Sequence, residues 1–246
     1  MALKKQKNGL IHNKHDSLQI KNRENIMLRF INQLLHKGMQ SISPCLLCGI
    51  DRQQQHSLCN DCWEQLPWYK QHIERHEHNI LCAHHYDFPI DRIIQTYKYE
   101  QQLQYQNLLA HSLLSLRIPK VHAIVPMPIS TERLKERGYN QMLIIAKIMA
   151  RELKIPVWQP VIRAAQHSQK GLSRIERLEN IEDQFQIITT EKRKYKKVLI
   201  IDDVVTTGSS IHALSQALTD LGCQQIYSAC VAVAGTKLSS LPLEKS

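Results

Sequence analysis

Residues 198–210 read Val-Leu-Ile-Ile-Asp-Asp-Val-Val-Thr-Thr-Gly-Ser-Ser. The first four residues are too few for a helix and too apolar for an exposed strand, so they predict a central strand covered on both faces of a sheet. Asp202 and Asp203 are expected to end that strand. Open α/β sheets bind ligands at the carboxyl ends of their strands, and two adjacent carboxylates suit the neighbouring hydroxyls of a ribose. The stretch therefore predicts a sugar-binding position.

The second half of the same stretch predicts a phosphate-binding helix N-terminus. A turn rich in hydroxyl groups is followed by apolar residues at helical spacing. The turn residues are Thr206, Thr207, Gly208, Ser209 and Ser210, and the apolar residues are Ile211, Leu214, Ala217, Leu218 and Leu221. Free backbone N–H groups, hydroxyl donors and the helix dipole favour an anion there, and Gly208 allows the backbone to approach it closely.

Three other interpretations of this stretch compete with a ribose and phosphate site. A Walker B strand requires a Gly-x-x-x-x-Gly-Lys loop elsewhere, and none of the eight glycines precedes a lysine. A receiver-type acidic pocket would lie early in its domain, whereas only 43 residues follow Asp203. An apolar strand with a solvated acid pair and an ordinary Ser/Thr helix cap remains the structural alternative.

The composition indicates one domain of ordinary size with a small appendage. The chain has 246 residues, of which 43% are hydrophobic, and its formal net charge is +10. No apolar run approaches the roughly 18 residues of a membrane span, and the N-terminus is too polar for a signal peptide. We therefore expect a cytoplasmic protein.

The positive charge is concentrated in two segments. Residues 1–26 contain six Lys or Arg and two acidic residues, and residues 132–177 contain ten and four. The internal segment indicates an anionic partner, with a solvated basic face as the alternative. Residues 1–26 are rich in Lys and Asn with scattered apolar residues, so we expect a disordered tail.

Four parts are expected along the chain. They are the basic tail over 1–26, a helix plus a four-cysteine module over 27–78, an α/β domain over 79–238 and a C-terminal tail over 239–246. Folded structure is expected to begin at Met27, because apolar residues follow it on one helical face.

Four cysteines form two Cys-x-x-Cys knuckles, Cys45 with Cys48 and Cys59 with Cys62. Two knuckles separated by a short loop place four thiolates at the corners of a tetrahedron, which is the geometry of a structural Zn²⁺ site. Four protein ligands leave no position open for a catalytic water. A redox-active Cys-x-x-Cys is the alternative. The histidines between residues 72 and 85 lack a paired knuckle, so the sequence does not assign them to a metal.

Apolar runs and helical periodicities alternate over the rest of the chain. Strands are expected at 80–86, 121–125, 161–162, 185–188, 198–201 and 226–233, and helices at 91–99, 103–116, 143–153 and 211–221. Residues 163–180 are polar and basic and predict a mobile loop that leads into a helical turn. Alternating strands and helices predict an α/β fold with a mostly parallel sheet.

Residues 198–210 strongly resemble the 5-phosphoribosyl-1-pyrophosphate (PRPP) motif of type I phosphoribosyltransferases. The order of motifs over residues 27–235 resembles the ComF (competence protein F) family, also called ComF/GntX. These motifs are the double Cys-x-x-Cys, Tyr97-Lys98-Tyr99, Val125-Pro126-Met127-Pro128, Arg137-Gly138-Tyr139-Asn140-Gln141 and the series Gln169, Leu172, Arg177, Asn180 and Phe185. Relatives often carry a longer cysteine-rich region, whereas Cys82 stands alone here. The resemblance implies a type I phosphoribosyltransferase-like, mostly parallel sheet flanked by helices, with a small N-terminal zinc module.

The resemblance also implies a set of site residues. Asp202 and Asp203 would hold the ribose hydroxyls of PRPP, residues 206–210 would hold its 5-phosphate, and Mg²⁺ would bridge the ribose hydroxyls and the pyrophosphate. Positive charge beside the leaving pyrophosphate would stabilise an oxocarbenium-like transition state. The cations expected there are Lys98, Arg137, Arg174 and Arg177.

A role in natural competence, DNA uptake or DNA utilisation is what the resemblance implies. Its expected partners are single-stranded DNA and other cytoplasmic competence proteins, such as a DNA-translocating helicase, in the cytoplasm or against the inner face of the membrane. Two functional classes stay open. A binding module would grip DNA with PRPP as its ligand, whereas a phosphoribosyltransferase would transfer the sugar to an acceptor that no residue identifies.

Overall fold

The computed structural model describes residues 43–163, 185–188 and 194–235. The chain divides into two compact units, one ending at Cys62 and the other beginning at Trp63. Outside the described residues lie the expected basic tail, the helix after Met27, the C-terminal tail and all but the first residue of the loop expected at 163–180. None of the helices in the described part of the chain has the length and apolar character that crossing a bilayer requires.

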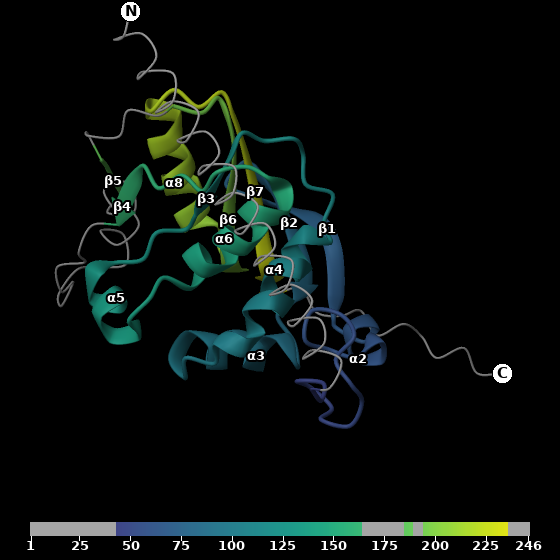
Figure 1. Cartoon of the computed structure of the whole chain (residues 1–246). Coiled ribbons are helices and arrows are strands. Elements are labelled where there is room, and N and C mark those ends of the chain that lie inside the picture. Colours follow the sequence, from purple (N-terminus) through teal and green to yellow (C-terminus); the bar gives the residue numbers. More distant parts are fainter. Residues whose placement is uncertain (1–42, 164–184, 189–193, 236–246) are drawn as a thin grey trace, which may run out of the picture. The chain divides into compact units, whose positions relative to one another are not determined.

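The second unit is built on a five-stranded sheet with the order β1-β2-β7-β6-β3 (Figure 1). The strands are β1 (Trp68–Arg75), β2 (His78–His85), β3 (Ala123–Pro126), β6 (Lys197–Val205) and β7 (Gln225–Val233). Neighbouring strands from β2 to β3 pair in parallel, and β1 pairs with β2 as an antiparallel hairpin. The prediction of a mostly parallel α/β sheet is therefore confirmed.

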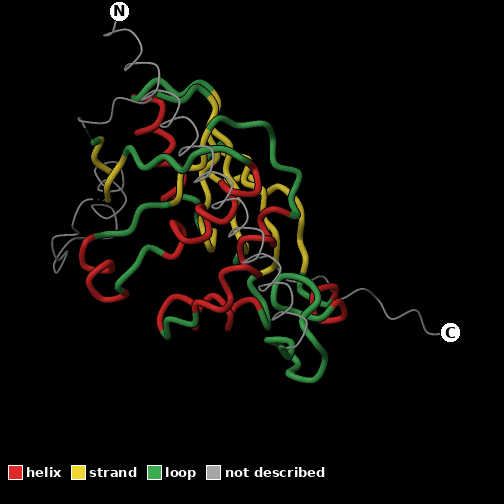
Figure 2. Tube along the Cα trace, viewed as in Figure 1, coloured by secondary structure: helices red, strands yellow, loops and turns green. Residues whose placement is uncertain are grey.

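Helices cover both faces of this sheet, as the tube in Figure 2 shows. On one face, α4 (Gln106–Leu114) contacts β2 and β7, while α6 (Gln141–Leu153) contacts β3, β6 and α4. On the opposite face, α8 (Ser209–Asp220) contacts β7. The remaining elements are α2 (Asn60–Glu64), α3 (Ile90–Tyr99), the 3₁₀ turn η1 (Leu103–Tyr105), α5 (Thr131–Arg137) and the separate antiparallel pair β4 (Val161–Arg163) and β5 (Phe185–Ile187).

Strand β6 forms the centre of the core, as the apolar run in its sequence predicts. Residues Val198–Ile201 are at most 1% exposed. The strand continues past the expected end at Asp202, because β7 keeps pairing with it as far as Val205 and Val233. The pairing of β3 with β6 stops earlier, at Pro126 and Ile201. The acid pair therefore lies inside β6, at the point where the neighbouring strand β3 ends.

Three elements differ from the sequence-based expectations. The sequence does not predict strand β1, because it is an edge strand with a single buried residue, Ile73, and lacks an apolar alternation. Its pairing with β2 places residues 63–78 in the second unit instead of the cysteine module expected to extend to residue 78. Helix α5 lies where the sequence pattern predicts neither a helix nor a strand, and β5 pairs with β4 outside the main sheet.

Candidate functional site

The four cysteines of the two knuckles converge in the first unit. The sulfur atoms of Cys45, Cys48, Cys59 and Cys62 all lie within 4.8 Å of one another. The Cys48 and Cys59 sulfurs are 3.9 Å apart, close to the roughly 3.8 Å expected for two thiolates 2.3 Å from a tetrahedral Zn²⁺. The backbone N–H of Leu47 donates to Cys45 Sγ at 3.4 Å. The donor set and its spacing fit a structural zinc ion.

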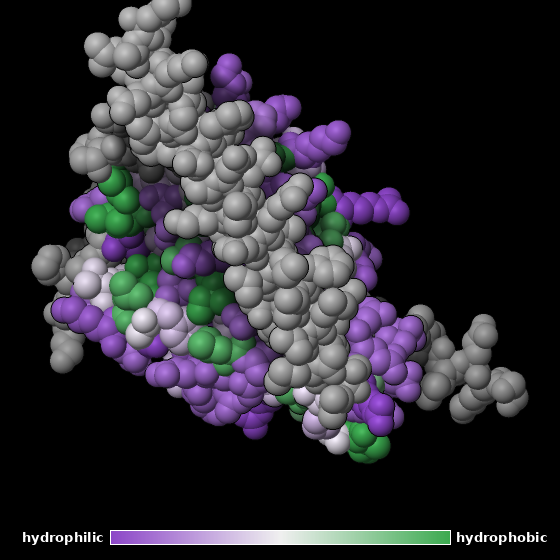
Figure 3. All heavy atoms as spheres, viewed as in Figure 1, coloured by the Kyte–Doolittle hydropathy of each residue, from purple (hydrophilic) through white to green (hydrophobic). Residues whose placement is uncertain are grey.

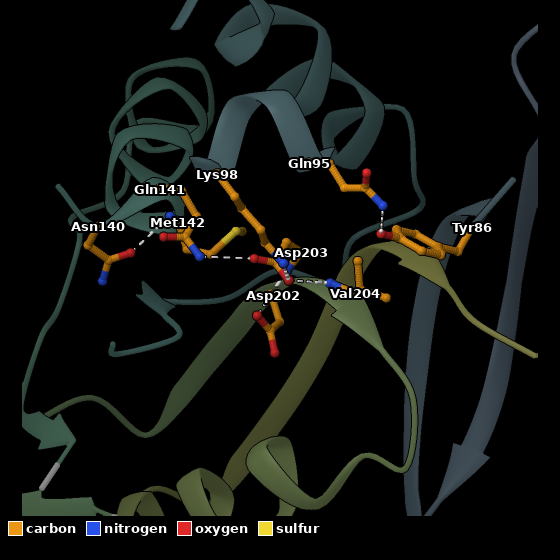
Figure 4. Close-up of polar contacts among 9 residues, drawn as sticks. All are labelled: Tyr86, Gln95, Lys98, Asn140, Gln141, Met142, Asp202, Asp203 and Val204. Atoms are coloured by element: carbon orange, nitrogen blue, oxygen red, sulfur yellow. Dashed lines mark hydrogen bonds and ion pairs between the residues drawn. The ribbon is translucent and has the colours of Figure 1, made fainter. Parts of the chain in front are cut away.

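Asp202 and Asp203 point to opposite faces of the sheet, because successive side chains alternate along a strand. Figure 4 shows Asp203 directed toward Lys98 and Gln141 and Asp202 directed away from them. The Asp202 side chain lines a small pocket together with residues 204–211, which include the whole hydroxyl-rich turn. The structure thus brings Asp202 and the turn together and places Asp203 on the other side of β6.

The Asp203 carboxylate is occupied by groups from two helices. Its Oδ1 lies 2.7 Å from Nζ of Lys98 at the end of α3 and accepts a 2.7 Å hydrogen bond from the N–H of Val204. Its Oδ2 accepts a hydrogen bond of 3.0 Å from Nε2 of Gln141, the first residue of α6. The pairing is largely shielded, since the side chains of Lys98 and Asp203 are 17% and 12% exposed. Asp203 therefore ties α3 and α6 to the central strand.

The motifs Tyr97-Lys98-Tyr99 and Arg137–Gln141 interlock around this ion pair. The Tyr97 hydroxyl donates to the Gln141 carbonyl at 3.3 Å, and the Tyr139 hydroxyl donates to the Tyr97 carbonyl. The Arg137 guanidinium lies 4.8 Å from the ring centroid of Tyr99. Two motifs about forty residues apart in the chain therefore form one cluster above Asp203.

Capping residues fix where this cluster begins and ends. The Asn140 side chain accepts hydrogen bonds from the N–H groups of Met142 and Leu143 and so starts α6. Its amide nitrogen also donates to the Met127 carbonyl at 3.2 Å, which attaches the segment 125–128 to the same cluster. Gly138 ends α5 with a left-handed φ of 78°. Helix α5 starts at Ser130, whose hydroxyl accepts from the Arg133 N–H, so cap residues that are visible in the sequence bound this short helix at both ends.

The pocket formed by Asp202 and the turn combines a carboxylate with the start of α8. The pKa of Asp202 is raised to about 7. Burial is the largest cause, and the neighbouring Asp203 carboxylate is the second. In the turn, the Thr207 hydroxyl donates to Ser209 Oγ at 3.1 Å and accepts from the Ser209 N–H at 3.4 Å. The first N–H groups of a helix lack intrahelical partners and attract anions. Chemically, the pocket offers an oxygen ligand beside an anion-binding helix start.

Strand β1 packs against the hydroxyl-rich turn at residues 206–210 through Arg75. The backbone at Gly208 has a φ of 84°, and a Cβ placed there would lie 2.6 Å from the Cβ of Arg75. The Arg75 guanidinium donates through Nε to the Thr206 carbonyl at 3.1 Å. Glycine is therefore required both by the backbone conformation and by the closeness of Arg75.

Replacing Gly208 with alanine is expected to lower the free energy of unfolding by about 2–4 kcal/mol, because left-handed strain and steric overlap add. Gly222→Ala is the matched control, since Gly222 has a φ of 91° and a Cβ placed there would meet nothing within 4 Å. It isolates the strain, which costs about 1–2 kcal/mol. Urea unfolding of both variants measures the difference, and equal losses would contradict the role of Arg75.

The residues expected to act as pyrophosphate-side cations have different surroundings. Lys98 pairs with Asp203. Arg137 is 7% exposed, and its Nε has no hydrogen-bond partner among the described residues. Arg174 and Arg177 lie outside the described residues.

Sequence reasoning missed Gln141, Arg75 and Arg163 as parts of the site. Gln141 donates a hydrogen bond to the Asp203 carboxylate, and Arg75 donates one to the Thr206 carbonyl. Arg163 lies near Asp202 and acts to lower its pKa, although burial outweighs this effect. Gln141 belongs to a motif that the sequence singled out, so only its role was missing. For Arg75 and Arg163 the sequence carries no signal, since both act across the fold.

An apolar cavity of about 480 Å³ lies between the end of β3, helices α5 and α6 and strand β4. Leu134 and Ile162 contribute to its lining and are 44% and 51% exposed. Figure 3 shows apolar residues gathered among polar ones on the face that carries these elements. Arg163 also lines this cavity, and the same side chain acts to lower the pKa of Asp202.

Comparison with known proteins agrees with this arrangement. The family model of the phosphoribosyl transferase domain matches residues 142–242. Competence protein F of Haemophilus influenzae is 30% identical over 204 residues, which cover 77% of this chain and 84% of that protein. The DNA utilization protein YhgH of Salmonella typhi is 25% identical over 203 residues, or 78% and 85% of the two chains.

Among solved structures, a purine phosphoribosyltransferase from Pyrococcus horikoshii covers 58% of this chain and 73% of its own, with 20% identity and a TM-score of 0.32. The family match spans β6, the turn, α8 and β7. That family match, together with the mostly parallel sheet, confirms the expected phosphoribosyltransferase-like α/β fold.

Proposed function

The chain belongs to the competence protein F (ComF) family, and from that premise we propose that it binds PRPP and acts in natural competence or DNA utilisation by gripping single-stranded DNA. It would do so in the cytoplasm, alongside other competence proteins such as a DNA-translocating helicase. The observation that carries the proposal is the pocket shared by Asp202 and residues 204–211.

The chemistry of this pocket supports PRPP as its ligand. In the proposed complex the Asp202 carboxylate accepts hydrogen bonds from the ribose hydroxyls, and residues 206–210 hold the 5-phosphate through backbone and hydroxyl donors. Mg²⁺ prefers carboxylate, phosphate and water oxygens, so Asp202 and the pyrophosphate fit it. Asp203 would act as a positioning residue that holds Lys98, whose charge acts to lower the pKa of Asp202.

Positive charge near the pocket supports an anionic leaving group or a nucleic acid. Lys98 could move from Asp203 to the pyrophosphate when PRPP binds, and the buried Arg137 has an N–H group available for an acceptor. Arg174 and Arg177 complete the proposed set. Helix α5 adds the exposed side chains of Arg133 and Lys135, and release of counterions from such groups drives binding to nucleic acids.

A catalytic phosphoribosyltransferase is the second candidate, because the matched family model describes a phosphoribosyl transferase domain. In that case the same cations stabilise charge that develops on the leaving pyrophosphate. The apolar cavity lined by Arg163 offers a space in which an acceptor could be held. The two candidates share the PRPP pocket and differ in what the basic residues do.

A pair of charge variants separates these candidates. Arg133→Gln with Lys135→Gln is expected to weaken single-stranded DNA binding in the presence of PRPP and to reduce its logarithmic salt slope by about 0.7 for each lost phosphate contact. The matched control is Arg117→Gln with Lys120→Gln. It also removes one exposed arginine and one exposed lysine, but both lie outside residues 132–177. Binding would be measured by fluorescence anisotropy over a salt series.

Pyrophosphate release from PRPP is measured on the same proteins. Unchanged DNA affinity in the α5 variant together with slower pyrophosphate release would overturn the DNA-gripping proposal in favour of the enzyme. An equal loss of DNA affinity in both variants would also contradict it, because the effect would then follow from net charge alone.

A further inference from the structure

A hollow of about 500 Å³ lies at the edge of the main sheet where β3 and β6 begin. Its lining comes from the segment before β3, the first residue of β6 and the end of α6 with the residues that follow it. A hydrogen bond of 2.8 Å from the His122 N–H to the Lys197 carbonyl joins the first two parts. From this edge, β6 and β7 run toward α3 (Figure 1). The amino-edge hollow shares no lining residue with the proposed PRPP pocket, so the two are separate sites.

Aliphatic side chains form the walls of the amino-edge hollow. They belong to Ile118, Pro119, Val121, Leu153 and Ile155. Leu153 is the last residue of α6 and is 38% exposed, so its apolar surface is open to a ligand. Among the described residues, no phenylalanine, tyrosine or tryptophan lines the hollow. The walls therefore suit an aliphatic body and lack the aromatic surface on which a nucleobase stacks.

The remaining side chains that line the hollow are basic. Lys120 and His122 are exposed, and Lys197 is half-buried. None of the described lining residues carries a carboxylate. Small-molecule sites commonly have volumes of about 300–1,000 Å³ and combine apolar walls with a few polar groups. Here the polar groups select an anion.

The surroundings of the hollow add further positive charge. Residues 117–122, 151–155 and 194–197 contain seven Lys or Arg and one acidic residue, Glu152, and Asp220 at the end of α8 adds a second acid. Basic residues near a helix C-terminus also compensate its dipole, which amounts to about half a negative charge. The dipoles of α4, α6 and α8, which all end near these segments, together offset about 1.5 charges. Most of the positive excess therefore remains for a ligand.

We propose that the amino-edge hollow binds an amphiphilic anion, whose aliphatic chain lies against the walls and whose acidic head group lies between Lys120, His122 and Lys197. A fatty-acid carboxylate and the phosphate of an anionic lipid share this chemistry. The site does not depend on the proposed binding of PRPP or DNA. Because the hollow and the PRPP pocket are separate, both ligands can be bound at once.

The test is binding of dodecanoate, below the concentration at which it forms micelles, to the full-length chain by calorimetry. Affinity is expected to fall about 4-fold for each methylene removed between dodecanoate and octanoate, because each buried methylene contributes to binding. Dodecyltrimethylammonium has the same chain and the opposite charge, so it should not bind. Dodecanoate should raise the melting temperature, which distinguishes binding to the folded state from unfolding by a detergent. Equal affinities for the two chain lengths, or for the two head groups, would overturn the proposal.

Variants of the rim locate the site. Lys120→Gln with Lys197→Gln is expected to weaken dodecanoate binding at least about 10-fold, because it removes both ammonium groups that face the anion. Lys135→Gln with Lys147→Gln is the matched control. It also removes two lysines, but these are exposed on α5 and α6, and Lys147 lines the other apolar cavity. A loss of affinity in the control instead of the rim variant would place the ligand in that cavity and overturn the proposal.

A substitution in the wall gives a check that leaves the charge unchanged. Leu153→Gln is expected to weaken dodecanoate binding about 5-fold, because a polar amide replaces apolar surface that the chain covers. Leu153→Met keeps an apolar side chain of similar volume and should restore wild-type affinity. Equal affinity in wild type and Leu153→Gln would remove the walls from the site and overturn the proposal.

Vesicles distinguish the two sources of the anion. Co-sedimentation with phosphatidylglycerol vesicles but not with neutral phosphatidylcholine vesicles, lost in Lys120→Gln with Lys197→Gln, would support a lipid of a bilayer as the ligand. Binding of dodecanoate without binding of either vesicle would support a free fatty acid. If neither dodecanoate nor phosphatidylglycerol vesicles bind, the proposal is overturned.

Discussion

Protein that carries Cys59→Ser and Cys62→Ser is expected to lose a tightly bound zinc ion, about one per chain, and with it the fold of residues 43–62. The buried residues of this segment are Cys45, Ser57, Leu58 and Cys59, so the segment has almost no apolar core without a metal. Structural zinc contributes about 10–16 kcal/mol of binding free energy in small domains, and that free energy becomes folding free energy. We therefore expect this double substitution to cause the largest loss of stability of any change to the first unit.

Metal analysis after a wash with a mild chelator, together with limited proteolysis of residues 43–62, measures this loss. Cys223→Ser is the control, because Cys223 lies outside the cluster and its loss should leave the zinc in place. The second unit should keep its cooperative unfolding in the double variant. Freshly purified, reduced wild-type protein without zinc would contradict the assignment.

Asp202→Asn is expected to weaken PRPP binding at least about 100-fold at pH 8, since it removes the carboxylate that faces the pocket and the charge that holds Mg²⁺. The fold should survive and become more stable. Because folding raises the pKa of Asp202 to about 7, ionisation at pH 8 costs folding free energy. The variant should therefore melt a few degrees above wild type at pH 8, and the difference should vanish below about pH 4, where the carboxyl is protonated in both states.

Asp203→Asn is the matched comparison and should behave in the opposite way. It breaks the ion pair with Lys98, so it should lower the free energy of unfolding by about 1–3 kcal/mol. Calorimetry with PRPP and Mg²⁺, combined with thermal melts, measures both variants. If both acids lowered stability alike, or if Asp202→Asn kept wild-type PRPP affinity, the division of roles between the two faces of β6 would be wrong.

The pH profile of wild type provides an independent check. PRPP affinity should fall about 10-fold between pH 8 and pH 6, because protonation of Asp202 with a pKa of about 7 removes the charged form. The phosphates of PRPP also titrate in this range, so the profile of Asp202→Asn serves as the baseline. A wild-type profile parallel to that baseline would show that Asp202 does not contact the ligand.

Local patterns in the sequence are sufficient to predict the centre of the fold. The apolar run at 198–201 predicts a strand buried on both faces, and the paired knuckles predict the convergence of four sulfurs, because spacing alone determines both. The edge strand β1 escapes prediction because its residues are mostly polar and exposed. Strand β1 is held by backbone hydrogen bonds to β2, and these bonds do not require an alternation of apolar and polar residues that could be recognised in the sequence.

The arrangement of the site requires distances that sequence cannot supply. The acid pair is expected from the sequence to act together, but the apolar residues Val204 and Val205 continue β6 and so place the two carboxylates on opposite faces. Lys98, Gln141 and Asp203 meet although up to about a hundred residues separate them. The sequence singles out their motifs, but only the fold shows that these motifs form one cluster.

The position of β7 in the sheet also constrains how the protein can be made. This strand is the last of the sheet in chain order, yet it lies between β2 and β6 in the middle of the strand order. On the ribosome, β2 has no parallel neighbour until residues 225–233 have left the exit tunnel, so the hairpin and the rest of the sheet remain two separate halves. A chain that stops before Gln225 therefore cannot complete its core, and premature termination yields two unpaired strand edges of the kind that promote aggregation.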